Sequence, residues 1–165
     1  RGALPHGTAT DKTLNRGDLV VLDFGCTLDG YCSDITRTIS IGPADLRAKE
    51  VYNIVLYAGE RARQSVVPGM KAKELDGVAR DIIKSFGYGE NFGHSLGHGV
   101  GIEVHERPTV GPSSEDVLIP GSVFTIEPGI YIEGLLGVRI EDMVYVDASG
   151  YTVLTKSTKE LIEII

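Results

Sequence analysis

The sequence is poor in cysteine, in long apolar runs and in positive charge. Its 165 residues include two cysteines, Cys26 and Cys32. They do not form the multi-cysteine pattern of a small secreted domain or the CxxC pairs of a zinc ribbon. We therefore expect neither a disulfide framework nor a cysteine-rich metal site, and we interpret both cysteines as buried thiols.

Long hydrophobic runs are also missing. No apolar run approaches the roughly 20 residues that a membrane-spanning helix needs, and the N-terminal residues lack the charged-then-apolar layout of a signal peptide. We expect a soluble, cytoplasmic protein without a membrane partner.

Basic residues are outnumbered: 16 Lys and Arg stand against 23 Asp and Glu, giving a net charge of −7. Because nucleic-acid binding depends on neutralising phosphates with basic side chains, we expect no nucleic-acid partner, whereas a cationic ligand suits this chain. Hydrophobic residues make up 42% and glycines number 21, which is typical of a globular fold with many tight turns. We predict one domain over residues 1–165, large enough for a real core.

Histidine is scarce and clustered. Three of the four histidines lie in HSLGHGVGIEVHE, residues 94–106. Imidazole is both a common metal ligand and the side chain that titrates near neutral pH, so this stretch is a candidate for chemistry. The spacing of His94 and His98 matches the zinc-binding HExxH helix, but Ser95 replaces the required Glu and the surrounding glycines oppose a helix. We reject that interpretation.

The alternation of side chains along a strand would place His98 and His105 on opposite faces, but it does not show which of them binds a metal. His98 shares its parity with Val100, Ile102 and Val104, which we expect to be the buried face of a strand, and His105 has the opposite parity. The pattern alone does not decide which histidine is a metal ligand.

The first chemical feature of the chain is a predicted β-hairpin. RGDLVVLDFG, residues 16–25, is apolar on both alternating faces and predicts a strand covered on both sides. Asp29-Gly30 predicts a two-residue turn, so that the numbers of facing residues sum to 59. Asp34 then faces Gly25 and lies diagonal to Asp23, within roughly 7 Å. Because a buried carboxylate needs a partner, the two acids indicate a polar site.

Two amphipathic helices are predicted next, over 43–65 and 71–86, with apolar stripes that we assign to the core. After the histidine stretch, ERPTVGPSSED, residues 106–116, is polar and Pro-rich, and we expect a surface loop there.

The early strand is repeated late in the chain. GSVFTIEPG aligns with GDLVVLDFG at an offset of 104 residues, which places Glu127 on Asp23 and indicates an internal duplication. The counterpart of Asp34 is then Glu141. A five-residue loop, residues 133–137, would make facing numbers sum to 270, with Glu141 diagonal to Glu127 and Arg139 on the same face.

Four converging carboxylates cannot all ionise without cations. Two divalent metals balance their charge. The acids and one imidazole form a hard ligand set suited to Mn²⁺ and able to hold Co²⁺ or Zn²⁺. Such a pair of metals generates a hydroxide near neutral pH and polarises a carbonyl, which predicts hydrolysis. The four acids are Asp23, Asp34, Glu127 and Glu141.

The ordered motifs LDFG, SDITRT, HSLGHGVGIEVHE, TIEPG and RIEDM resemble the pita-bread metallopeptidases, in the Xaa-Pro branch of prolidase and aminopeptidase P. The resemblance covers essentially the whole chain. It implies an α+β fold in which duplicated hairpins form a curved, mostly antiparallel sheet with helices outside. It also implies a dinuclear site, usually of manganese, bridged by Asp34 and Glu141. The implied metal ligands are Asp23, Asp34, His98, Glu127 and Glu141.

The resemblance implies an exopeptidase that hydrolyses Xaa-Pro bonds through a metal-bridged hydroxide, on peptides with proline second, and a homodimer of the full-length protein. Glu127 would be the general base, and His105 would stabilise the tetrahedral intermediate. Arg139 would orient the site. The implied pocket-lining and substrate-binding residues are His6, His94, His105 and Tyr131.

The chain departs from this family in two respects. Thr109 stands where many similar prolidases carry an Arg just after Pro108, and Arg107 precedes that proline instead. Strict dipeptidase action is therefore not implied. The family's catalytic domain also begins some helices earlier, so we expect a domain incomplete at its N-terminus. The missing first-half helices would leave an apolar sheet face bare, which favours association.

Two alternatives remain. One is a hydrolase like methionine aminopeptidase, which the short interval from Glu127 to Glu141 and the histidine of ALPHG disfavour. The other is a non-catalytic binding module, or an inactive fragment, on the same fold. Retention of all five implied ligands favours an enzyme.

Overall fold

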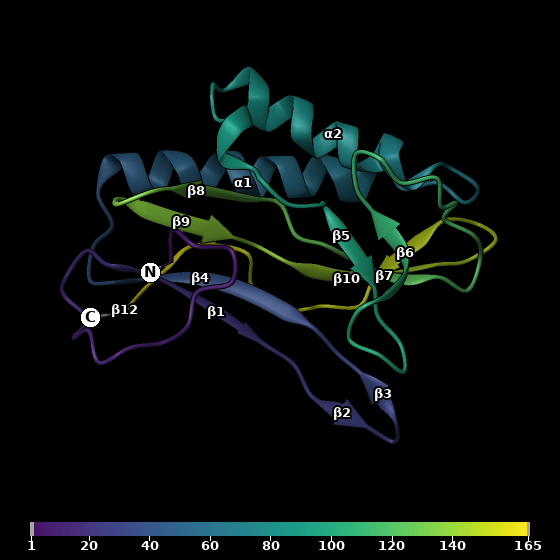
Figure 1. Cartoon of the computed structure of the whole chain (residues 1–165), viewed down its shortest axis with the longest axis horizontal. Helices are drawn as coiled ribbons and strands as arrows, with labels where there is room; N and C mark the ends of the chain where they lie inside the picture. Colours follow the sequence, from purple (N-terminus) through teal and green to yellow (C-terminus); the bar gives the residue numbers. More distant parts are fainter. Residues whose placement is uncertain (1, 165) are drawn as a thin grey trace.

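The computed structural model describes residues 2–164, and its elements run as strands, then helices, then strands (Figure 1). The early elements are β1 Leu19–Phe24, β2 Thr27–Leu28, β3 Tyr31–Cys32, β4 Ile35–Ile41, α1 Leu46–Gln64 and α2 Ala72–Ser85. The later elements are the 3₁₀ helix η1 Gly89–Asn91, β5 Gly97–Gly99, β6 Glu106–Val110, β7 Val123–Ile126, β8 Gly129–Ile132, β9 Leu136–Arg139, β10 Asp142–Val146, β11 Tyr151–Val153 and β12 Ile162–Ile164. The fold is α+β, as predicted.

The first hairpin has the predicted register. β1 and β4 pair antiparallel with Asp23 opposite Thr36, and the small β2–β3 pair continues the same register to its tip. At the tip, Asp29 has φ 50° and Gly30 has φ 87°. Both residues need positive φ in the two-residue turn that matches the twist of a hairpin, and Asp and Gly supply it at low cost. The predicted turn is confirmed.

The register predicted for the second hairpin is wrong by two. Gly129 pairs with Arg139 in β8–β9, and Ile126 pairs with Asp142 in β7–β10, so facing numbers sum to 268. The turn is three residues long, 133–135, because Gly134 takes φ 70° and closes it early. Between the paired strands, this register sets Glu141 directly opposite Glu127 rather than diagonal to it.

The internal repeat is visible in the backbone. Gly17 and Gly121, 104 residues apart, have φ 93° and 97°. The residue after each glycine donates its N–H to the carbonyl three residues before it, at 3.0 Å in both copies. Each glycine N–H also bonds to the end of its returning strand, Ile41 in one half and Val146 in the other. Both hairpins therefore begin with the same turn.

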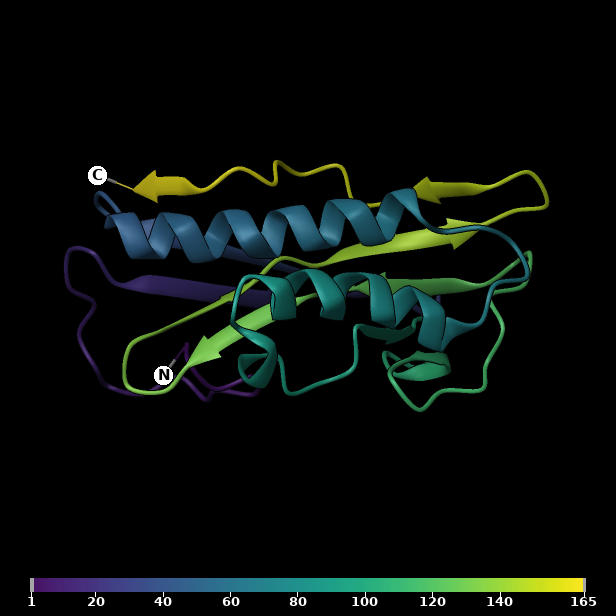
Figure 2. The ribbon, with the colours of Figure 1, turned by 90° about the horizontal axis from the view of Figure 1, so that it is seen from above.

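The two helices pack side by side on the outer face of the second hairpin (Figures 1 and 2). Asp45 caps α1, since its Oδ1 accepts the Ala48 N–H at 2.7 Å. The predicted stripe of α1 is buried, whereas in α2 Ile83 is fully buried and Ile82 partly. Each fully buried aliphatic side chain contributes roughly 1.5–3 kcal/mol. This core fixes the second hairpin beneath the helices and contains Val51, Val55, Leu75, Phe124, Ile126 and Val144.

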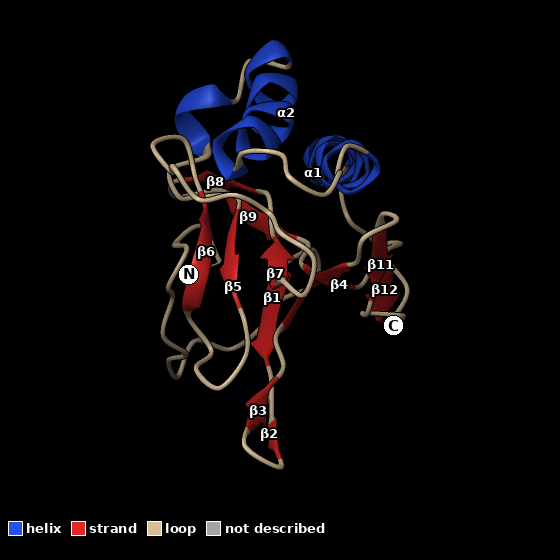
Figure 3. Cartoon of the chain, turned by 90° about the vertical axis from the view of Figure 1, so that its right-hand side faces the viewer, coloured by secondary structure: helices blue, strands red, loops and turns tan. Residues whose placement is uncertain are grey.

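Within residues 2–164, no helix covers the equivalent face of the first hairpin. The pair Phe124 and Val144 is fully buried, but its counterpart in the repeat, Val20 and Ile39, is only half-buried. Leu22 is 38% exposed. The prediction that β1 is covered on both sides is therefore wrong for the described chain, because α1 and α2 both lie over the second half (Figure 3). The bare apolar face that we expected is present.

Two local predictions fail around the histidine stretch. Residues 100–105 form a loop, with Ile102 74% exposed, and not a strand with a buried apolar face. The region that we expected to be a surface loop supplies strand β6 instead. β6 pairs with β5 across a register shift between His98 and Gly99, and this irregularity breaks the strand periodicity on which the prediction depended.

The cysteines are less buried than predicted. Cys26 is exposed and Cys32 is partly exposed, because the β2–β3 tip extends away from the core (Figure 3). Within residues 2–164, no helix has the length and apolar character needed to cross a bilayer.

Candidate metal centre

A pocket of about 610 Å³ lies where the two hairpins meet the β5–β6 region. Its wall contains nearly every side chain singled out from the sequence. The residues concerned are His6, Asp23, Asp34, His94, His98, His105, Glu127, Arg139 and Glu141. Tyr131, expected to bind substrate, is the exception: it is buried behind this wall.

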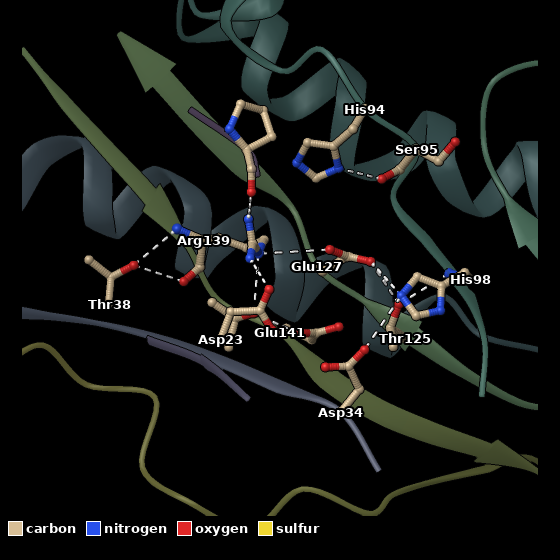
Figure 4. A network of polar contacts seen from close by, with 12 residues as sticks. Asp23, Asp34, Thr38, His94, Ser95, His98, Thr125, Glu127, Arg139 and Glu141 are labelled. Atoms are coloured by element: carbon tan, nitrogen blue, oxygen red, sulfur yellow. Dashed lines mark hydrogen bonds and ion pairs between the residues drawn. The ribbon is translucent and has the colours of Figure 1, made fainter. Parts of the chain in front are cut away.

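Three side chains form the centre of the site. Donor atoms of Asp34, His98 and Glu141 all lie within 4.8 Å of one another. The His98 Nε2 is 3.7 Å from the Asp34 Oδ2 and 3.2 Å from the Glu127 Oε1 (Figure 4). These residues come from the end of each hairpin and from β5. One nitrogen and several carboxylate oxygens at this spacing fit a hard divalent cation.

Glu141 is the most enclosed of the acids that line the pocket, with 2% of its surface exposed. Its Oε2 accepts a hydrogen bond of 2.6 Å from the Thr36 hydroxyl of the other hairpin. Burial, followed by the charges of Glu127 and Asp34, raises the pKa of Glu141 to about 8. A carboxyl in this position needs a proton or a cation.

The imidazole of His98 is oriented for ligation. Its Nδ1 lies 3.1 Å from the Gly99 carbonyl and must donate to it, which directs Nε2 toward the acids. Burial alone would lower the pKa of His98, but its bonds to Glu127 and Gly99 and the nearby acids raise it to about 8. The acids therefore attract positive charge to this point.

The pKa values of Asp34 and Glu127 are also shifted by burial and by the neighbouring charged groups. Burial, followed by the charge of Asp23, raises the pKa of Asp34. Burial also opposes ionisation of Glu127, yet its hydrogen bond with His98 and the charges around it hold its pKa below the usual value. The Thr125 hydroxyl donates to Glu127 Oε1 at 3.0 Å. The site thus fits cations on donor chemistry and on charge.

Arg139 connects Asp23 to the rest of the site. Its Nη2 lies 2.6 Å from the Asp23 Oδ2, and its Nε donates to the Thr36 hydroxyl at 3.1 Å. Its Nη1 donates to the Pro5 carbonyl at 2.8 Å, which holds the segment carrying His6 beside the pocket. The guanidinium is buried, so its charge is weakly screened and acts strongly on the nearby acids.

Tyr131 links Arg139 to His94. Its hydroxyl accepts from Arg139 Nη1 at 3.0 Å and lies 3.0 Å from the His94 Nε2. The His94 Nδ1 must donate to the Ser95 carbonyl, at 2.7 Å, so Nε2 is the acceptor for the tyrosine proton. Burial lowers the pKa of His94. The hydrogen bonds from Arg139 through Tyr131 to His94 therefore hold a neutral imidazole at the pocket wall.

His105 reaches the site from the exposed loop that follows β5. Its ring centre lies 4.1 Å from that of His98, edge to face. The two histidines are thus neighbours in space, although the expected strand between them is absent.

The glycines around His98 have a steric role. A Cβ on Gly97 would lie 1.9 Å from the Thr125 carbonyl oxygen, and one on Gly99 would lie 2.2 Å from the Arg107 carbonyl oxygen. The backbone of β5 therefore approaches its neighbours too closely for any side chain, which brings His98 within reach of Glu127.

Sequence reasoning missed two buried ion clusters beside the site. Asp142, fully buried, lies 2.8 Å from Arg37, 2.9 Å from Arg63 and 3.3 Å from Lys159. Arg37 also donates to the carbonyls of Thr36 and Glu141 and so joins the two hairpins. The sequence feature that pointed to this cluster was Asp142, the acid that follows Glu141 in RIEDM.

The second cluster lies on α2. Asp76 is fully buried, binds Arg80 through both oxygens and accepts the Leu96 N–H at 3.0 Å. Arg80 donates to the carbonyls of Phe92 and His94, at 2.9 and 2.8 Å. The pair fixes the segment that leads into β5. An acid and an arginine four residues apart were visible in the sequence, but such pairs are common on solvated helices.

Known proteins resemble this chain closely. Residues 1–148 match the family described as metallopeptidase family M24. An Xaa-Pro dipeptidase of Pyrococcus furiosus is 56% identical over 162 residues, which cover 98% of this chain and 47% of that protein. The chain thus spans about half the length of the curated relatives it matches.

Solved structures agree with this relationship. An Xaa-Pro dipeptidase from Bacillus anthracis has a TM-score of 0.97 and 52% identity, covering 99% of this chain and 46% of that one. An X-Pro aminopeptidase from Thermotoga maritima MSB8 has a TM-score of 0.96 and 49% identity, covering 99% and 47%. The predicted pita-bread fold is confirmed by these neighbours.

Proposed function

Because the chain belongs to metallopeptidase family M24, we propose that the full-length protein is a metal-dependent exopeptidase that hydrolyses Xaa-Pro peptide bonds. The observation that carries the proposal is the convergence of Asp34, His98 and Glu141 in a pocket. Relatives named Xaa-Pro dipeptidase support the substrate class.

The proposed metal centre holds two divalent ions, with Mn²⁺ first and Co²⁺ or Zn²⁺ as alternatives. Bound there, the ions supply Lewis acidity that polarises the scissile carbonyl and makes a water nucleophilic near neutral pH. Asp34 and Glu141, whose donor atoms lie within 4.8 Å of one another, would hold both ions. The proposed ligands are Asp23, Asp34, His98, Glu127 and Glu141.

The proposed proton transfers use groups at the pocket wall. Glu127 accepts the proton of the attacking water, since its low pKa keeps it ionised and Thr125 fixes one of its oxygens. His105 donates a hydrogen bond to the oxygen of the tetrahedral intermediate. His94 and His6 contact the substrate. Arg139 orients Asp23 and the Pro5 segment.

The partner proposed for the site is a peptide with proline second, whose cationic amino terminus suits the acidic pocket. We further propose a cytoplasmic location and a homodimer of the full-length protein.

The test is peptide hydrolysis by the full-length protein loaded with two equivalents of Mn²⁺. We expect turnover of Ala-Pro-containing peptides and a loss of roughly 100-fold or more in Glu141→Gln, with the exposed Glu160→Gln as matched control. Absence of turnover on every Xaa-Pro peptide, with the metal bound, would falsify the proposal. Faster hydrolysis of Met-Ala peptides would favour the methionine aminopeptidase alternative.

The histidines allow a second test. His98→Ala should weaken metal binding, roughly 10- to 100-fold, whereas His105→Ala should retain the metal and lower kcat. Titration calorimetry with Mn²⁺ measures the first effect, and steady-state kinetics the second. Equal loss of metal from both variants would contradict this division of roles.

A further inference from the structure

The first hairpin holds Glu141 at its backbone as well as at its side chain. Glu141 lies in the short gap between β9 and β10, outside both strands. Its N–H donates to the Thr36 carbonyl at 3.0 Å, and its carboxylate accepts from the Thr36 hydroxyl at 2.6 Å. Its carbonyl accepts from Nη1 of Arg37. Two successive residues of β4 therefore fix the position of this acid.

Arg37 makes five hydrogen bonds, as many as its guanidinium and Nε have N–H donors. The acceptors are the carbonyls of Thr36, Glu141, Ser157 and Thr158 and the carboxylate of Asp142. The side chain is buried. Because the donors of a planar guanidinium point in fixed directions, the groups that accept from Arg37 are held in fixed relative positions.

These acceptors belong to three segments that are distant in sequence: β4, the start of β10, and the C-terminal segment 157–158. The C-terminal segment is itself tied to α1, since the Tyr52 hydroxyl donates to the Lys159 carbonyl at 2.9 Å. Among the described residues, Arg37 is not part of the pocket wall. Any effect of Arg37 on the site must therefore pass through the residues that it holds, and Glu141 is the one that reaches the pocket.

A second arginine in the same cluster provides a contrast. Arg63, on α1, is also buried, and its Nη1 lies 2.9 Å from the Asp142 Oδ2, while Nη2 of Arg37 lies 2.8 Å from the Oδ1. Within residues 2–164, the ion pair with Asp142 is the one that Arg63 forms. Replacing either arginine disturbs the buried cluster, but replacing Arg37 also frees the Glu141 carbonyl.

We propose that Arg37 is a positioning residue of the metal centre. Supported by the C-terminal segment, it holds the Glu141 backbone against β4 and so places the Glu141 carboxylate where the metal ions bind. The proposal rests on the proposed metal-dependent function and adds to it a residue outside the pocket. Lysine would keep the charge, but a single ammonium with three donors cannot span the acceptors that Arg37 joins.

The test is the Mn²⁺ affinity of full-length Arg37→Lys, measured by titration calorimetry, with Arg63→Lys as matched control. Loss of a group that orients a metal ligand typically lowers metal affinity, so we expect Arg37→Lys to weaken Mn²⁺ binding roughly 10-fold or more. Arg63→Lys should weaken it much less. Urea unfolding of the metal-free proteins should show that both substitutions lower the free energy of unfolding, which separates a general loss of stability from a loss of metal binding.

Tyr52→Phe tests the same support with a smaller change and decides the matter if Arg37→Lys does not fold. It removes the hydrogen bond to the Lys159 carbonyl and leaves Arg37 and every acid of the site in place. We expect it to weaken Mn²⁺ binding roughly 2- to 5-fold, since one hydrogen bond of the C-terminal segment is lost.

Three results would overturn the proposal and leave the metal centre standing. They are an Mn²⁺ affinity of Arg37→Lys equal to that of the unmutated protein, equal losses of affinity in Arg37→Lys and Arg63→Lys, and an unchanged affinity in Tyr52→Phe. A different result, no Mn²⁺ binding by the unmutated full-length protein, would refute the proposed metal centre and this proposal together.

Discussion

At the scale of single residues, Glu141 and His98 determine how the site responds to pH. The pKa of each is raised to about 8 in the metal-free fold. Near pH 7 both groups therefore carry a proton, and a metal ion must displace these protons before it binds.

We predict that Mn²⁺ affinity rises between pH 6 and pH 9 and that binding near pH 7 releases protons. The stability of the metal-free fold changes with pH in the opposite direction: it falls as the pH rises. Both folded pKa values exceed the unfolded ones, so the stability contributed by these groups is present below about pH 6.5 for His98, and below about pH 4.5 for Glu141, and is lost as pH rises through 8. Calorimetry in buffers of different ionisation enthalpy measures the number of protons released when Mn²⁺ binds. Urea unfolding in the presence of a chelator measures the stability of the metal-free fold as a function of pH.

Glu141→Gln is the control for this pH dependence. It should release fewer protons on binding and flatten the stability profile. An Mn²⁺ affinity that does not change between pH 6 and pH 9 would contradict the assignment.

At the scale of elements, α2 is tied to the histidine stretch through Asp76 and Arg80. Asp76 accepts from Leu96, and Arg80 holds the carbonyls of Phe92 and His94. The helix therefore fixes the approach to β5.

We predict that Asp76→Ala lowers the free energy of unfolding by on the order of 2–4 kcal/mol, because it leaves a buried N–H and a partly buried guanidinium without their partner. The matched control is Asp81→Ala, on the exposed side of the same helix. Urea unfolding of both variants measures the difference. Similar losses in the two variants would show that the buried cluster contributes little.

Elements defined by local rules were predictable. The Asp29-Gly30 turn fixed one register, and helical periodicity located α1 and α2 within a few residues. Gly134 shortened the second turn by two residues, a change that the repeat argument did not include. β6 pairs with the nearby β5, but the register shift between His98 and Gly99 breaks the alternation on which single-sequence periodicity depends.

The meeting of the site's acids was also predictable from the sequence. Repeated hairpins predicted which acids meet, since each copy carries them at its end. The clusters of Asp142 and Asp76 were not predictable, because their significance depends on burial between elements.

At the scale of the whole molecule, helices cover one half of the repeat, whereas the described part of the chain places no helix over the other half. The bare face continues onto β12, where Ile162 and Ile164 pair in parallel with β4 and are also exposed. A contiguous apolar face of this kind favours association.

We predict that the 165-residue chain self-associates at micromolar concentration and that Leu22→Ser weakens the association at least several-fold. Leu46→Ser, at an exposed position on α1 and outside the β1–β4–β12 sheet, is the control. Sedimentation velocity over a concentration series measures the effect. A chain that remains monomeric, or an equal effect of both substitutions, would contradict this prediction.

The two hairpins are joined by the Glu141 N–H, which donates to the Thr36 carbonyl at 3.0 Å, and by the Thr38 hydroxyl, which bonds to the backbone of Arg139. These bonds lie between the acids from the two halves. The deuterium uptake of the Glu141 amide therefore reports the separation of the two halves, since exchange requires that bond to open. Uptake at this one amide measures how often the acids of the two halves separate, and it should slow when a metal ion holds them together.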